Sequence, residues 1–506
     1  MLKVESSFNR SALVLVAGRT VGFICRFALA VFLARHLAQV EFGLYKQAFL
    51  LQSTFIMLLD LGLPASLYYF LQQDGEARRQ YVSQSLPMLA LAGAVGGVAV
   101  VVGAPWWGEA FYDKLLGPLT PHLAVFLGST LLSSVLEVIL IARERARQAA
   151  VVYCVSDLAM VALVLGAVLG GGGVAGILEA VTLVQGVRTI ALVLYARRVG
   201  LLSFRGLSWA PFRQLWNYAI PFWAGHIVEL FAVAAPQYYV SGRYDTQTYA
   251  VFAVGSTSVP FVDVLYATIV SIVVVQLTRL AQVGAVDQIR DTLGNGIRLM
   301  AVACLPLFVL LELIAGDVIV LLYTQRFADA VPVFRVSLLV LPLLATQLEY
   351  VPRAYGDTRF LFVMCAIKGA VCVGCLSVLP QTLGLAGAPL AYVMALVASH
   401  AVLLVRVSRL AGLPYAEVWP LGMLGRILAA CLVSAIPVLL LKSLGLLAYW
   451  PILAAASVAY ALAYGIALWR FRVLGPSERE TVRALGRRLA VLGGFLPSRE
   501  AVGGQR

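Results

Sequence analysis

The sequence predicts an all-α polytopic membrane protein with about fourteen transmembrane helices, and composition is the first reason. Of the 506 residues, 61% are hydrophobic and only 12% are charged, whereas soluble globular domains contain about 45–50% apolar and about 25% charged residues. A water-soluble fold with this composition would expose larger apolar patches than soluble monomers tolerate. The second reason is that apolar residues occur in runs of about 20, the length of helix that crosses a bilayer.

Fourteen such runs follow one another with short polar segments between them, at 11–34, 43–71, 83–103, 122–142, 150–171, 174–194, 213–235, 248–275, 295–315, 331–351, 360–379, 384–405, 423–441 and 449–469. Four glycines at 170–173 separate the fifth run from the sixth, and their backbone freedom suits a tight hairpin. No small-residue cleavage site follows a short apolar core near the N-terminus, so we expect the first run to be a spanning helix.

The basic residues predict the topology. With the N-terminus in the cytoplasm, 27 of the 38 Lys and Arg residues lie in inner segments and six lie in outer loops, among them Arg35, Lys46 and Arg326. Cytoplasmic loops carry the excess of Lys and Arg, so this asymmetry predicts both termini inside and an even number of spans. We therefore interpret the net charge of +13 as a sign of membrane topology and not of nucleic-acid binding.

A repeated helix entry suggests two six-helix halves. Phe42 and Tyr45 follow the short loop after the first run, and Tyr249 and Phe252 follow the loop after the seventh run, 207 positions later. Transporters are commonly built from internal repeats, with the substrate site between the halves. We expect an N-terminal lobe (helices 1–6) at 1–200, a C-terminal lobe (helices 7–12) at 201–410 and a further helix pair at 411–475.

The segment 476–506 is expected to be a basic amphipathic cytoplasmic tail. Ser477 and Glu480 have the spacing of a helix capping box. Apolar side chains then recur on one face, and arginines lie off it. Such a helix lies on an anionic membrane surface, so anionic lipids are its expected partners. A disordered tail is the alternative.

Several short motifs resemble those of a known family. They are Gly43-Leu44-Tyr45 followed by Asp60 to Ser66, then Tyr218 to Phe222, and then the stretch from Pro306 to Ala330. In order and spacing they resemble the O-antigen and capsule-type oligosaccharide flippases of the multidrug/oligosaccharidyl-lipid/polysaccharide exporter superfamily, through about the twelfth helix. The resemblance implies two six-helix lobes around a central cavity, two extra helices, and a polyprenyl-diphosphate-linked glycan as cargo.

Basic residues deep in the spans are candidates for binding that cargo. Arg19 and Arg26 lie seven residues apart, close to two helical turns, so they share a face of the first helix and are about 10 Å apart along its axis. The guanidinium group binds phosphate oxygens through two parallel hydrogen bonds, so this pair suits a diphosphate. Arg188 and Lys368 are further candidates, with snorkelling toward a helix end as the alternative.

Acidic residues within the spans are candidates for ion coupling or gating. Asp60 and Asp263 lie near the middle of helices two and eight, which are equivalent in the two halves, and Glu229 lies well into helix seven. Charged residues inside a membrane are unfavourable and usually face protein or a water-filled cavity. Protonation of one such carboxylate would change the charge balance between the lobes, so H⁺ or Na⁺ is a possible coupling ion and no other cofactor is expected.

A purely structural role is the alternative for each of these charges. Arg19 or Arg26 would then pair with a buried acid such as Asp60, although one acid does not easily neutralise two arginines. For Glu137 and Asp157, which face each other across one predicted hairpin, the structural interpretation is the stronger.

No catalytic motif accompanies these charges. The four histidines are scattered, and the sequence contains no Walker-type phosphate-binding loop and no metal-ligand spacing. Cys372 and Cys375 have C-x-x-C spacing but lie within an apolar run, where small core filler is the better interpretation. We therefore expect a non-enzyme without a bound metal.

The leading hypothesis is a flippase that moves a lipid-linked oligosaccharide from the cytoplasmic to the periplasmic leaflet of the bacterial inner membrane for polysaccharide biosynthesis, as in O-antigen and lipopolysaccharide assembly. Within the same superfamily the alternatives are a peptidoglycan-precursor flippase and a cation-coupled drug antiporter. A membrane glycosyltransferase or glycan polymerase is the alternative of another class, but it needs a larger loop than 104–121. We expect a monomer whose partners include a polysaccharide polymerase.

Overall fold

The computed structural model describes residues 2–71, 76–112, 114–143, 145–202, 209–259, 262–346, 348–444, 450–471 and 473. Within these ranges the side chains of residues 2–17, 19, 76–77, 146, 221–222 and 358 lie outside the description. The predicted amphipathic tail at 476–506 also lies outside the described residues. What is described is nearly all helical and contains no β-strand, as the composition predicts.

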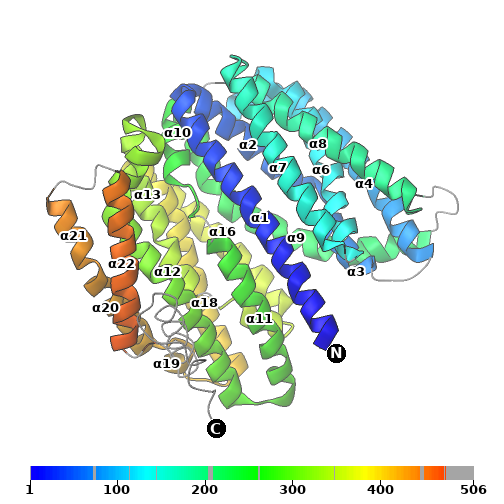
Figure 1. Cartoon of the computed structure of the whole chain (residues 1–506). Coiled ribbons are helices and arrows are strands. Elements are labelled where there is room, and N and C mark those ends of the chain that lie inside the picture. The colour runs from blue at the N-terminus through cyan, green and yellow to red at the C-terminus, as the bar shows by residue number, and fades with distance from the viewer. Residues whose placement is uncertain are drawn as a thin grey trace, which may run out of the picture.

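The first half of the chain supplies eight α-helices, which we refer to as the N-terminal lobe: α1 (Leu2–His36), α2 (Gln39–Leu59), α3 (Leu63–Phe70), α4 (Glu76–Val102), α5 (Ala104–Ala110), α6 (Thr120–Ala142), α7 (Ala146–Leu169) and α8 (Gly173–Arg198). Figure 1 shows them as one group of roughly aligned rods, coloured blue to cyan-green. In this lobe α6 packs on both α4 and α8, and α1 packs along α7.

The second half supplies the C-terminal lobe: α9 (Trp209–Arg243), α10 (Thr246–Gly255), α11 (Val262–Val283), α12 (Val286–Tyr323), α13 (Val331–Leu338), α14 (Val340–Ala345), α15 (Tyr350–Ala354), α16 (Thr358–Leu376), α17 (Leu379–Leu383) and α18 (Gly387–Ala411). The extra helices are α19 (Tyr415–Val418), α20 (Leu421–Ser434), α21 (Ile436–Ser443) and α22 (Trp450–Arg470), and α20 and α22 pack on each other and on α12.

Twelve helical stretches in the described chain are long and apolar enough to cross a membrane, and the bent pair α2 and α3 makes thirteen. The 35-residue helix α1 is not among them. Each of the fourteen predicted runs overlaps one of these stretches or α1, so the predicted class of an all-α polytopic membrane protein is confirmed. The count of fourteen, the placement of both termini inside and the lobe boundaries stay predictions.

Two predicted spans are interrupted in the structure. The run 43–71 bends by 45° between α2 and α3, where Leu61 and Gly62 have left-handed backbone angles of 50° and 67° in φ. The run 248–275 stops at Gly255, and the described residues 256–259 that follow are not helical. Pro64 and Pro260 follow these breaks in the sequence, and proline disfavours the helical conformation in the residue before it. A count of apolar residues does not register such breaks.

The hydrophobic core shows where the lobes are joined. One cluster of buried side chains includes Leu33 and Phe42 from the N-terminal lobe and Tyr249 and Phe327 from the C-terminal lobe. Two other clusters lie toward the opposite ends: one is built from the N-terminal lobe together with Leu215 and Ala219 at the start of α9, and the other from the C-terminal lobe and the extra helices. In Figure 1 the lobes correspondingly meet where α2, α10 and α13 lie, near the top, and diverge toward the other end. We refer to the joined end, which the charge pattern places outside, as the closed end.

Two arginines connect the lobes at the closed end. Arg35, at the end of α1, donates from Nε to the carbonyl of Leu322 at 2.9 Å and also donates to that of Leu321. Arg326, just after α12, donates from Nη2 to the carbonyls of Arg35 at 2.8 Å and Ala34 at 3.5 Å. The last carbonyls of a helix lack partners in that helix and carry partial negative charge. Each arginine therefore caps the helix of the other lobe.

Helices α2 and α10 also approach each other closely at this end. The side-chain amide of Gln247 donates to the side-chain oxygen of Gln39 at 2.8 Å. A Cβ atom placed on Gly43 would lie 2.1 Å from the carbonyl oxygen of Thr246. Only glycine allows this backbone-to-backbone approach, so position 43 controls how tightly the lobes close.

The substitution Gly43→Ala is expected to weaken the closed end, because the clash is with backbone. Overpacking typically costs about 1–3 kcal/mol, and about 1.4 kcal/mol is a factor of ten in an equilibrium. A cysteine introduced at Ser53 should therefore react with an impermeant maleimide added outside about tenfold faster, above the background of the native cysteines. The matched control is Gly186→Ala, since a Cβ there meets no heavy atom within 4 Å. Equal labelling in both variants would contradict this view of the closed end.

Candidate functional site

Three neighbouring cavities surround the break between α10 and α11. The first, of about 290 Å³, lies between the lobes and is bordered by α2, α9 and α10. The second, of about 450 Å³, extends into the C-terminal lobe. The third, of about 220 Å³, is bordered by Phe27 of α1 and by α10 and α12. Thr257 and Ser258 line all three, so the non-helical segment is their common wall. Irregular backbone is tolerated at membrane depth where it is buried in protein or lines such a cavity.

Lys46 lines the cavity between the lobes. The charge count groups it with the outer loops although the predicted run 43–71 includes it, and the structure places it within α2, which begins at Gln39. A signal for this start exists: the backbone N–H of Ala38 donates to the carboxylate of Glu41 at 3.1 Å, which is half of a capping box. The Lys46 ammonium lies 5.4 Å from the centre of the Phe42 ring and 5.8 Å from that of Tyr45.

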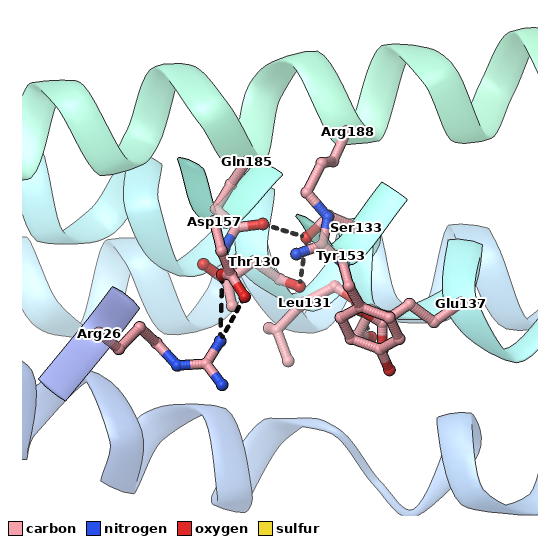
Figure 2. Close-up of polar contacts among 10 residues, drawn as sticks. Arg26, Thr130, Leu131, Ser133, Glu137, Tyr153, Asp157, Gln185 and Arg188 are labelled. Carbon is pink, nitrogen blue, oxygen red and sulfur yellow. Dashed lines mark hydrogen bonds and ion pairs between the residues drawn. The ribbon is translucent and has the colours of Figure 1, made fainter. Parts of the chain in front are cut away.

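Arg26 forms an ion pair with Asp157 of α7. Its Nη1 atom lies 3.1 Å from both carboxylate oxygens, and its side chain is 53% exposed while that of Asp157 is mostly buried. Figure 2 shows the guanidinium group extending from α1 toward this carboxylate. Gly22 makes the approach possible, since a Cβ there would lie 1.8 Å from the carboxylate. The Arg26 partner is thus Asp157 and not Asp60, and the side chain of Arg19 lies outside the described residues.

Asp60 stands at the break between α2 and α3. Its carboxylate accepts a hydrogen bond from the backbone N–H of Gly62 at 3.0 Å. The indole N–H of Trp223 in α9 donates to the carbonyl of Leu58 at 3.1 Å. Both contacts satisfy backbone groups that the interrupted helix leaves free. The contacts of Asp60 therefore stabilise the bend, and they leave its predicted part in coupling untested.

Arg188 pairs with Glu137 inside the N-terminal lobe. Arg188 Nη2 lies 2.7 Å from Glu137 Oε1, and the Tyr153 hydroxyl donates to the other carboxylate oxygen. Next to this pair, the Ser133 hydroxyl donates to Gln185 at 2.7 Å. Figure 2 shows these side chains in a row between α6, α7 and α8. Because both charged side chains are mostly buried, the pair joins three helices of one lobe.

Lys368 and Glu229, predicted for two different roles, are brought together in the C-terminal lobe. Lys368 of α16 is only 2% exposed, and its Nζ lies 2.5 Å from Glu229 Oε1 and 3.9 Å from Glu349 Oε1. Cys365 donates from Sγ to the other Glu229 oxygen at 3.3 Å. Glu349 also lies 3.8 Å from Arg353. Two cations and two carboxylates thus balance each other in this cluster.

Asp263 lies in the first turn of α11 and lines the 450 Å³ cavity together with Gln237, Ser337 and Tyr392. A carboxylate in this position interacts favourably with the positive end of the helix dipole. Among the described residues no ion pair involves it. An open carboxylate in a cavity is able to take up a proton or hold a cation. For a bound metal, the described residues contain no group of three or more His, Cys, Asp or Glu side chains arranged as ligands.

Two lobes of membrane-length helices meet here at one end around a cavity, an arrangement that is also found in transporters. The lipid II flippase MurJ, in an inward closed conformation, has a similar fold, with a TM-score of 0.72, 14% identity, and coverage of 91% of this chain and 98% of MurJ. An inward-facing multidrug resistance MATE family transporter of the MOP superfamily has a TM-score of 0.62 at 15% identity, covering 79% and 98%. A MOP superfamily transporter from Pyrococcus furiosus Vc1 (DSM3638) has a TM-score of 0.54 at 14% identity, covering 80% and 96%.

The family follows from the sequence. The model of the polysaccharide biosynthesis protein family matches residues 8–275, which is more than half of the chain. The protein therefore belongs to this family, and it is a multi-pass membrane protein with a transporter fold. No curated protein sequence matches the chain.

The buried pair Arg188–Glu137 is expected to contribute to the stability of the N-terminal lobe. Glu137→Leu should lower the free energy of unfolding by about 3 kcal/mol, because it leaves a buried guanidinium without its carboxylate. The double variant Glu137→Leu/Arg188→Leu should recover most of this loss, since it removes both charges. Thermal unfolding of the purified protein in detergent measures both effects. A double variant as unstable as the single one would show that the pair is not the source of the stability.

Proposed function

We propose that the protein is a flippase that moves a polyprenyl-diphosphate-linked oligosaccharide from the cytoplasmic to the periplasmic leaflet of the bacterial inner membrane. Family membership supports a role in polysaccharide biosynthesis, and the fold supports transport. The observation that carries the proposal is the polar cavity between the lobes, with Lys46 in its wall and Thr257 and Ser258 continuing into the neighbouring cavities. A hydroxylated glycan with an anionic anchor needs a polar path across the membrane, which a purely apolar core would not provide.

In this proposal the diphosphate is held by Arg26 and by Arg19, with the lipid tail in the bilayer. Arg26 suits the role because its side chain is half exposed although it is paired with Asp157. A phosphate approaching from the exposed side would share the guanidinium group with that carboxylate or displace it. Arg188 and Lys368, whose charges are balanced by buried acids, act in this proposal by holding helices together.

Alternating access would follow from rocking of the lobes. The arrangement with one closed end and diverging lobes at the other corresponds to a cavity facing the cytoplasm if both termini lie inside. Asp263 is the favoured coupling carboxylate, since it lines a cavity and Glu229 is bound to Lys368. H⁺ or Na⁺ would supply the coupling, and no further cofactor is required.

The alternatives remain within the same fold. MurJ is a lipid II flippase and the MATE proteins are multidrug transporters, so a peptidoglycan precursor or a drug is a competing cargo. Two arginines on one face of α1 favour a diphosphate over a cationic drug. An enzyme that transfers or polymerises sugars is disfavoured because the sequence holds no catalytic constellation.

A double-variant experiment tests the part proposed for Arg26. Arg26→Gln should reduce translocation of a polyprenyl-diphosphate-linked oligosaccharide in proteoliposomes about 10- to 100-fold, since hydrogen bonds to charged groups contribute about 1.5–3 kcal/mol. Accessibility of the glycan to an external glycosidase is the measurement. Arg26→Gln/Asp157→Asn removes both charges of the pair. It therefore repairs any defect caused by an unpaired Asp157 carboxylate but does not restore phosphate binding. Full activity in the double variant would show that Arg26 only fastens α1 to α7.

Asp263→Asn should make the translocation rate independent of an imposed H⁺ or Na⁺ gradient, because the neutral amide takes up neither ion. Rates with and without each gradient in the same proteoliposomes give the comparison. Asp287→Asn is the matched control, because Asp287 also lies in the first turn of a helix but forms an ion pair with Arg290. An Asp263→Asn protein that still responds to the gradient would exclude this residue as the coupling site.

A further inference from the structure

Lys46 differs from three other described cations that the sequence singles out within the spans. Arg26, Arg188 and Lys368 each have a carboxylate within 3.1 Å. For Lys46, no such carboxylate is found among the described residues, and its recorded contacts are the rings of Phe42 and Tyr45. An ammonium group away from bulk water is unfavourable unless an anion compensates it. Two aromatic faces at more than 5 Å compensate only part of a charge.

A residue with an unused hydrogen-bonding group borders the same cavity as Lys46. The hydroxyl of Ser256 is buried and has no hydrogen-bond partner in the described structure, and Ser256 borders the same cavity as Lys46. Ser53 and Thr257, also at this cavity, donate to the carbonyls of Leu50 and Ala253. A buried hydroxyl without a partner is unfavourable, so a ligand oxygen that accepts from Ser256 would be stabilised there.

The two halves of this arrangement come from different lobes. Lys46 is on α2 of the N-terminal lobe, and Ser256 follows α10 of the C-terminal lobe. The close approach of α2 and α10 at the closed end brings them to one cavity. A ligand that contacts both therefore binds this state more tightly than a state in which the lobes have separated at this end.

From these observations we infer that Lys46 and Ser256 form a binding subsite for an anionic oxygen group of the cargo, at the end of the cavity next to the closed end. The subsite rests on the proposed function. It binds the group while the closed end is shut and loses it when α2 and α10 move apart, which makes it the last binding position before release. The group is a phosphate of the lipid anchor or a carboxylate of an acidic sugar.

Binding measurements on the purified full-length protein in detergent test the subsite. The probes are farnesyl diphosphate, with farnesol as its uncharged control, and methyl glucuronide, with methyl glucoside as its uncharged control. Lys46→Gln should weaken binding of at least one anionic probe tenfold or more, and Lys46→Arg should keep it within about threefold. Ser256→Ala should give a smaller loss. Lys114→Gln is the charge-matched control, because Lys114 is exposed outside the long helices.

The pattern across probes identifies the source of the anion. A loss confined to farnesyl diphosphate assigns the lipid anchor, and a loss confined to methyl glucuronide assigns an acidic sugar. Equal affinities in native and Lys46→Gln proteins, or no binding of either probe by the native protein, would overturn the subsite. Thermal unfolding of Lys46→Gln and the binding of Lys46→Arg separate a misfolded variant from a true loss of the anion site.

The outcome is independent of the flippase assay. A native protein that binds an anionic probe through Lys46 but moves no glycan in proteoliposomes would refute the proposed function and leave the subsite intact. If the native protein and Lys46→Gln move glycan equally well and bind the probes equally well, the proposed function stands and the subsite is refuted.

Discussion

The need to compensate charge in a medium of low dielectric constant organises this structure. An isolated charge within the hydrocarbon region is unfavourable, so it is retained only with a counter-charge or access to water. Arg26 with Asp157, Arg188 with Glu137 and Lys368 with Glu229 each join helices distant in sequence. Because lipid supplies no hydrophobic force between helices, such pairs and close glycine contacts decide which helices pack together.

The same constraint applies to the backbone, and it explains where the helices break. Peptide groups at a break lose their helical partners and must find others. The N–H of Gly62 finds the side-chain carboxylate of Asp60, and the carbonyl of Leu58 finds the indole N–H of Trp223. At Ser256 the chain leaves the helix beside three cavities. One break is therefore closed by protein groups, and the other lies where a polar ligand or water has room.

Two kinds of contact hold the lobes together at the closed end. The reciprocal capping by Arg35 and Arg326 uses hydrogen bonds to helix ends, which water would replace if the lobes parted as proposed. The buried contact of Phe42 with Phe327, with ring centres 5.7 Å apart, adds apolar area at the same end. At the opposite ends the cores are separate clusters, and the one beside α3 and α4 also takes in Leu215 and Ala219 from the start of α9.

The sequence by itself determined that this protein lies in a lipid bilayer, that it is helical, and roughly where each span lies, because composition and run length depend only on local residues. It also identified Arg26, Glu229, Lys368 and Asp263 as charges that require an explanation. Only the tertiary structure decided their partners: Asp157 lies 131 positions from Arg26, and Glu229 lies 139 from Lys368. Pairing over such distances follows from helix packing, which no local pattern encodes. The place of Lys46 inside α2, beside a break in the opposite lobe, was decided in the same way.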